Sequence, residues 1–249
     1  MDATFRSTTD VLVRRLESVG ALADVEKAAI EKLPIQVTSL RADQDIVREG
    51  DRPTRSCLVV QGFACTFKIT GEGKRQIMAF QFAGDIPDLQ SLHLTVLDSS
   101  LGTITPCTVA FIQHEALHDL CDRHPGIAAA LWRTTLIDAS IFREWVTNIG
   151  RRQAYSRIAH LLCEVVVRMR AVGLAENGTC DLPMTQDELA DATGISTVHV
   201  NRTLQELRGD KLITLRGERL TVLDWRGLTQ AGDFDPTYLH LREPERVAR

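Results

Sequence analysis

The stretch that most constrains this chain is "MTQDELADATGISTVHVNRTLQELRGDKLI", residues 184–213. Thr185 followed by Glu188 has the spacing of a capping box, which predicts that a helix begins at Thr185. Gly194 can adopt the left-handed conformation that ends a helix, and Ser196 is a favoured N-cap for the next one. The stretch therefore predicts two short helices joined by a three-residue turn.

The apolar residues of this stretch indicate how the two helices pack. Leu189, Ile195, Val200 and Leu204 have the spacing to lie between them, and the small Ala190 allows close approach, which is typical of a helix-turn-helix. The early exposed positions of the second helix are Thr197, Val198, His199, Asn201 and Arg202.

A recognition helix reads base edges in the major groove of double-stranded DNA with such N-terminal residues. Arg202 has the donors for a bidentate contact with guanine. Thr185, Gln186 and Ser196 stand where helix N-termini could meet phosphate. The alternative is a generic helical hairpin with a solvated polar face.

The segment "KLITLRGERLTVLD" predicts a β-hairpin around Gly217, a wing whose Arg216 could contact the DNA backbone. The local charge does not favour DNA. Residues 184–224 contain five basic and seven acidic side chains, a balance of −2. Binding would depend on where the basic side chains lie, with help from the arginines of residues 151–157.

The first half of the chain has a different pattern of apolar residues and turns. Residues 11–33 carry apolar residues at helical spacing and predict one or two short helices broken near Gly20. From residue 35 to 112, short alternating runs such as "CTFKIT" are separated by glycine-containing turns. This pattern predicts an antiparallel barrel or sandwich.

A long helix is predicted from Pro125 to Gly150, which enclose a stretch without internal glycine or proline beyond Gly126. Such a helix packs on its own domain or pairs with a twin in a homodimer. We interpret one stripe as the dimer seam. It comprises Leu131, Thr134, Ile137, Ile141, Trp145 and Asn148.

In order, the chain has a β-domain, a long helix and a winged helix-turn-helix, and so it resembles the CRP/FNR family of bacterial transcription regulators. "IVREGDRPTRSCLVVQGFACTFKI", "GKRQIMAFQFAGD" and "TPCTVAFI" carry the resemblance in the β-domain. It implies an α+β fold with an antiparallel β-roll or jelly-roll effector domain and its N-terminal helices (1–124), a dimerisation helix (125–150) and a winged helix-turn-helix with a C-terminal tail (151–249). It also implies a homodimer that binds a palindromic site. RNA polymerase would be a further partner if the protein is an activator.

The chain departs from the cyclic-AMP-binding members at the effector pocket. Gly84 and Asp85 stand where those members have Gly-Glu, and Leu97 and Asp98 stand where they have Arg-Ser. Residues 85–106 contain no Arg or Lys, and Asp88 adds a further negative charge, so a cyclic phosphate would lack its cationic partner. We therefore expect that cyclic AMP is not the effector, and the effector stays unknown.

Cofactors are not expected. The oxygen-sensing members hold an iron–sulfur cluster on N-terminal cysteines, but the first cysteine here is Cys57. His114, His118 and Cys121 have metal-ligand spacing on a helix. We favour the alternative, an amphipathic helix with solvent-facing histidines, and predict no metal site.

At the DNA face, Val198 replaces the family's Glu. A valine cannot accept a hydrogen bond from cytosine, so the preferred DNA half-site should differ from the family's best-known half-site.

Other functions are weakened by what the sequence lacks. No P-loop, G-x-S-x-G or H-E-x-x-H motif indicates an enzyme. No apolar run is long enough to span a bilayer and no secretory signal is evident, so we expect a cytoplasmic protein without membrane partners. The alternative function is a ligand-sensing β-roll whose C-terminal helices bind protein. We also expect the tail to dock on the winged domain through Phe234, Tyr238 and Leu241.

Overall fold

The computed structural model describes residues 8–242. Two short helices, α1 (Asp10–Glu17) and α2 (Asp24–Glu31), come first, separated near Gly20 as predicted. They precede an antiparallel β-domain of two sheets. One sheet has the order β1-β7-β3 and the other β2-β6-β4-β5. The strands are β1 (Ile35–Leu40), β2 (Asp45–Val47), β3 (Arg55–Gln61), β4 (Ala64–Ile69), β5 (Arg75–Gln81), β6 (Ser100–Thr103) and β7 (Cys107–Gln113).

Three clusters of buried apolar side chains hold the β-domain together and join it to the rest of the chain. Cys57, Val59 and Val109 lie in the cluster between the two sheets. A second cluster joins β3 and β7 to the helices at the N-terminal end. A third includes Phe67 of β4 and Phe80 of β5 and runs through the C-terminal half.

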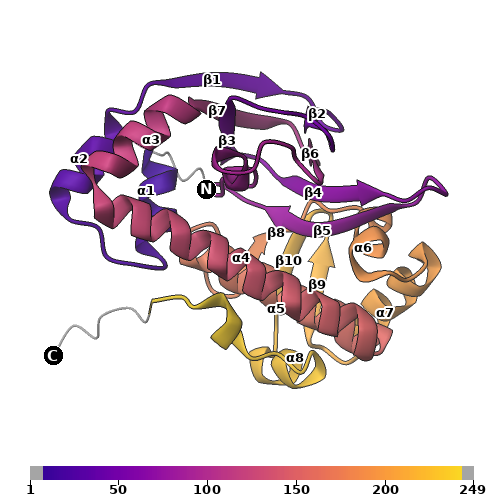
Figure 1. Cartoon of the computed structure of the whole chain (residues 1–249). Coiled ribbons are helices and arrows are strands. Elements are labelled where there is room, and N and C mark those ends of the chain that lie inside the picture. The colour runs from indigo at the N-terminus through magenta and orange to yellow at the C-terminus, as the bar shows by residue number, and fades with distance from the viewer. Residues whose placement is uncertain (1–7, 243–249) are drawn as a thin grey trace, which may run out of the picture.

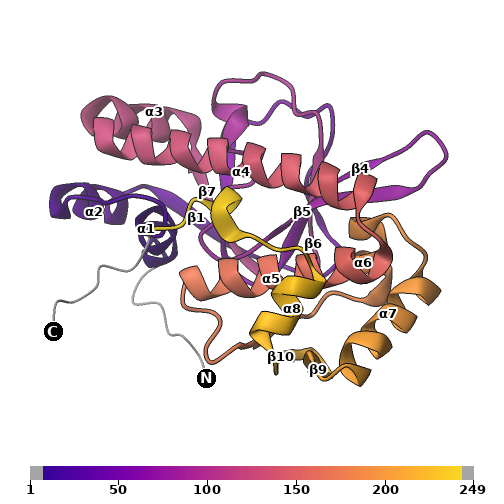
Figure 2. The ribbon, with the colours of Figure 1, turned by 90° about the horizontal axis from the view of Figure 1, so that it is seen from below.

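The long helix α4 (Pro125–Arg151) follows α3 (His114–Arg123) and runs along the whole molecule (Figure 1). Helices α1, α2 and α3 lie at one end of it, and helices α6 (Gln186–Thr193) and α7 (Thr197–Gly209) lie at the other (Figures 1 and 2). Pro125 at the start of α4 needs no backbone donor there, which favours this position for proline.

The C-terminal half is a winged helical domain. Its helices are α5 (Ala154–Ala171), α6 (Gln186–Thr193), α7 (Thr197–Gly209) and α8 (Trp225–Ala231), and its strands are β8 (Thr179–Asp181), β9 (Ile213–Arg216) and β10 (Arg219–Val222). The hairpin around Gly217 is confirmed. The polar segment around residues 174–183 contains β8, which pairs with β10 and makes the wing three-stranded.

The tail folds back as predicted. Phe234 is buried, and Tyr238 and Leu241 pack against the same apolar cluster as the winged domain. Two short 3-10 turns complete the fold, Leu89–Leu92 in the β-domain and Pro236–Leu239 in the tail.

Candidate nucleic-acid interface

The two helices of the motif begin and end where local sequence signals place them. Thr185 Oγ1 accepts from the Glu188 amide at 3.2 Å, and the Thr185 amide donates to Glu188 Oε2 at 2.7 Å, so both halves of the capping box are formed. Gly194 ends α6 with φ +66°, in the left-handed region. Ser196 Oγ accepts from the His199 amide and caps α7. The predicted helix-turn-helix is confirmed.

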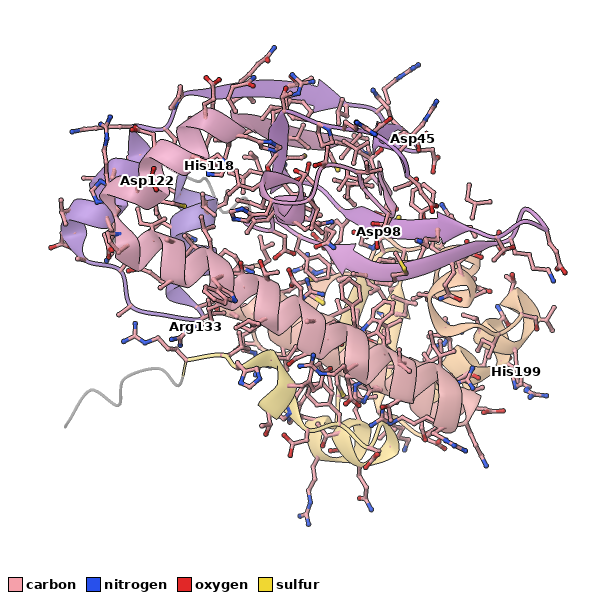
Figure 3. All side chains as sticks on the ribbon, viewed as in Figure 1. Asp45, Asp98, His118, Asp122, Arg133 and His199 are labelled. Carbon is pink, nitrogen blue, oxygen red and sulfur yellow. The ribbon has the colours of Figure 1, made fainter. Side chains whose placement is uncertain are left out.

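The packing between α6 and α7 fixes which side of α7 faces outward. Leu189, Val200 and Leu204 are buried, and Ile195 packs partly buried against the same cluster. Val198, on the opposite side of α7, exposes 81% of its surface. His199 lies at the outer edge of the molecule, away from the β-domain (Figure 3). The early residues of α7 are therefore accessible to a large partner.

The polar side chains on this face are already bonded to one another. Thr197 Oγ1 donates to Asp187 Oδ1 at 2.6 Å, and Asn201 Nδ2 donates to Gln186 Oε1 at 3.0 Å. DNA would have to replace these bonds. Asp187 was not among the predicted interface residues. Its place in the first turn of α6 suits a carboxylate, but it puts a negative charge beside any phosphate.

Arg202 is held by its own helix. Its Nη2 lies 2.7 Å from His199 Nε2, and its Nε lies 3.7 Å from Glu206 Oε1. The side chain is exposed, so these contacts position the guanidinium without burying it. Arg216 is exposed at the end of β9, on the wing.

The predicted dimer seam on α4 faces the interior of its own protomer. Leu131, Thr134, Ile137, Ile141, Trp145 and Asn148 are all buried within one protomer. Trp145, for example, meets the ring of Phe80 edge-on, with centroids 6.0 Å apart. These side chains are covered by their own chain and cannot also form the seam with a second copy.

A different apolar stripe of α4 is exposed. Trp132, Leu136, Phe142 and Val146 lie at helical spacing and expose 69%, 58%, 40% and 73% of their surface. We call these four residues the outer stripe. Single exposed apolar residues are ordinary, but a row of four large ones along a helix is typical of a binding surface.

The four candidate effector-pocket residues do not share one pocket. Gly84 and Asp85 line a small cleft with α1 and α4, and Leu97 and Asp98 are not part of its lining. Leu97 is buried against the turn at residues 50–51, where its amide donates to the Asp51 carbonyl at 3.0 Å. Asp98 is exposed. Asp88 is buried and accepts from the Cys57 amide at 2.8 Å, and burial raises its pKa to about 7.

The histidines of α3 form no metal centre in the structure. His114 Nε2 lies 3.1 Å from Ser91 Oγ, and the exposed His118 ring packs edge-on against His93. Leu117 and Leu120 face inward, as the amphipathic interpretation expects. Within residues 8–242, no group of three or more His, Cys, Asp and Glu side chains is arranged to hold a metal ion.

Two family models match the chain. Residues 37–124 match the cyclic nucleotide-binding domain, and residues 156–231 match the Crp-like helix-turn-helix domain. The chain belongs to the CRP/FNR family. Its α+β fold is that of this family, and it is a DNA-binding transcription regulator.

Relatives agree with this assignment, and a solved structure agrees with the fold. The chain is 29% identical to the transcriptional activator protein FnrL of Cereibacter sphaeroides, over 88% of this chain and 90% of the relative. It is 25% identical to the nitrogen fixation regulation protein FixK of Azorhizobium caulinodans, over 67% and 66%. The structure of FixK2 from Bradyrhizobium japonicum superposes with a TM-score of 0.73 at 24% identity, covering 80% of this chain and 98% of that one. No described helix is long and apolar enough to cross a bilayer.

Proposed function

We propose that the protein binds a palindromic DNA site as a homodimer, that α7 reads the bases, and that cyclic AMP is not required. The observation that carries the proposal is the pairing of an accessible recognition face on α7 with the outer stripe on α4. A two-fold dimer formed through the outer stripe would present two copies of α7 to one duplex, and symmetric dimers read symmetric sites.

The independence from cyclic AMP is supported by the lack of space for a ligand beside Gly84 and Asp85. The cleft beside Gly84 and Asp85 has a volume of about 10 Å³, room for about one water molecule. Pockets for small ligands usually measure about 300–1,000 Å³. Asp85 is already paired with two arginines and is not a free partner for a ligand.

The direct test is selection of duplexes from a random pool by the full chain with no added effector. We expect enrichment of a palindrome with a guanine in each half-site, and we expect that cyclic AMP leaves the bound fraction unchanged. Enrichment of an asymmetric site would contradict the dimer. A fluorescent cyclic-AMP analogue that binds at micromolar concentration would contradict the independence from cyclic AMP.

The acidic balance of residues 184–224 favours the second candidate, a sensory module whose C-terminal helices bind protein. If this second candidate is correct, the same selection should enrich no duplex. The relatives named as activators suggest RNA polymerase as a further partner. Transcription in vitro from a promoter next to the selected site, with purified polymerase, tests that part.

A further inference from the structure

Helix α1 lies directly on the Gly84–Asp85 turn that follows β5. A Cβ added at Gly84 would stand 2.6 Å from the Val11 carbonyl oxygen and 2.7 Å from Arg15 Cβ. Leu12 and Leu16 of the same helix are buried and line the residual cleft. The turn accepts the helix only because residue 84 has no side chain, and α1 fills the space above it.

One carboxylate at this turn joins two distant helices. Asp85 Oδ1 accepts from Arg15 Nε of α1 at 2.9 Å, and Asp85 Oδ2 accepts from Arg168 Nη2 of α5 at 3.1 Å. All three side chains are about nine-tenths buried. The Arg168 guanidinium also lies over the Phe82 ring, 4.7 Å from its centroid.

The chain of contacts continues from Arg168 into the long helix and the tail. Arg168 Nη1 lies 3.4 Å from Glu164 Oε1 on the same face of α5. Glu164 is buried and accepts from Trp145 Nε1 of α4 at 3.0 Å and from the Tyr238 hydroxyl at 2.8 Å. We call Arg15, Asp85, Arg168 and Glu164 the Asp85 cluster.

Two members of the Asp85 cluster, Arg168 and Glu164, belong to α5, the helix against which the recognition motif packs. Helix α5 packs against α6 and α7, and α6 also contacts β5. There Arg75 Nε donates to Asp191 Oδ2 at 2.7 Å, and Gln76 Nε2 donates to the Asp191 carbonyl at 2.7 Å. The winged domain is thus bound to the β-domain at two places. The outward face of α7 stays accessible in this arrangement.

Stability alone does not explain a buried cluster of charges. Replacing such a cluster with apolar side chains of similar volume is often neutral or stabilising, because the charges lose their hydration on folding. Buried ion pairs do, however, impose one geometry, since removal of one member leaves another charge unpaired. Asp138 of α4 lines the same cleft and adds a further carboxyl to it, so the two arginines are surrounded by acids.

We propose that α1 is a built-in ligand of the β-domain: it occupies the effector side of the Gly84–Asp85 turn, and its Arg15 holds Asp85 and Arg168 in the arrangement that orients the winged domain for DNA. This inference rests on the proposed function. It implies that the DNA-binding arrangement forms without a diffusible effector. It also implies that loss of Arg15 creates a cavity for a small cation.

The test uses the full chain and the selected duplex, with binding measured by fluorescence anisotropy. Arg15→Ala should weaken binding at least tenfold, because the winged domain loses its fixed orientation. Ethylguanidinium at millimolar concentration should restore at least part of the affinity, since it can replace the missing group. The control is Lys27→Ala, which removes the partly exposed Lys27–Glu17 ion pair between α1 and α2. It should bind within twofold of wild type, with or without ethylguanidinium.

A second variant covers the outcome that Arg15→Ala does not fold. Arg15→Met with Asp85→Asn removes both charges of one pair at similar volume. We expect it to fold and to bind DNA at least tenfold more weakly. Wild-type affinity in the double variant, or in folded Arg15→Ala, would overturn the inference, as would a failure of ethylguanidinium to restore binding. Absence of specific binding by wild type would instead refute the proposed function.

Discussion

Substitutions at two adjacent residues of α4 should distinguish an effect on dimer formation from an effect on folding. Ile137 exposes 2% of its surface and Leu136 exposes 58%. Full burial of a leucine stabilises by roughly 2 kcal/mol, so covering the exposed part of Leu136 in a dimer is worth about 1 kcal/mol per chain and about 2 kcal/mol per dimer. Leu136→Ala should therefore raise the dimer dissociation constant about 30-fold.

Ile137→Ala should instead lower the free energy of unfolding of the protomer. It leaves a cavity among side chains of the same protomer, at a cost of about 2–5 kcal/mol in the free energy of unfolding. The assays are sedimentation velocity across a concentration series and urea unfolding at two protein concentrations, because dimer formation itself raises apparent stability. If Leu136→Ala leaves association unchanged while Ile137→Ala abolishes it in a folded protein, the outer stripe is not the seam.

Three further predictions concern single side chains. Arg202→Ala should cost about 1–3 kcal/mol and relax preference at one guanine of each half-site, measured by competition with substituted duplexes, whereas Arg208→Ala at the far end of α7 should keep that preference; equal weakening on all sequences would make Arg202 a phosphate contact only. Asp88 keeps its proton to about pH 7 in the folded state but loses it near pH 4 in the unfolded chain, so it contributes stability that falls as pH rises through this window, by up to about 4 kcal/mol. Asp88→Asn should remove that part of the slope in urea unfolding between pH 5 and 8, and an unchanged slope would mean that Asp88 is ionised when folded. Trp145→Phe deletes the indole donor to Glu164 and should lower the free energy of unfolding by about 1–3 kcal/mol in urea unfolding, and no loss would show that Glu164 finds another donor.

The elements that the sequence predicted well are those set by neighbouring residues. The capping box at Thr185, the turn at Gly194 and the cap at Ser196 each depend on side chains within a few positions. The seam on α4 was misassigned because the helix carries two apolar stripes, and spacing alone does not say which one the protomer covers. Strand β8 is three residues long, too short for a recognisable alternation.

The Asp85 cluster depends on contacts between residues far apart in the chain. Arg15 and Asp85 are 70 positions apart, and Arg168 and Asp85 are 83 apart. A faint signal was present: Arg15 stands beside Leu16 on the apolar side of α1, and Arg168 follows the apolar residues of α5. A charge among buried positions indicates a buried partner, but not which one.

The structure changes the reason for excluding a cyclic nucleotide. The sequence predicts that the acidic residues near the pocket repel a phosphate, yet Asp85 is neutralised by two arginines, Asp88 is buried, and Asp98 lies outside the cleft. The obstacle is α1 itself. An effector that entered here would have to displace the helix, which breaks a buried ion pair at about 3–5 kcal/mol and exposes Leu12 and Leu16 at about 1.5–3 kcal/mol each. A ligand with an intrinsic nanomolar affinity, about 12 kcal/mol, would be left with roughly 1–6 kcal/mol of net binding, which corresponds to an affinity of tens of micromolar at best.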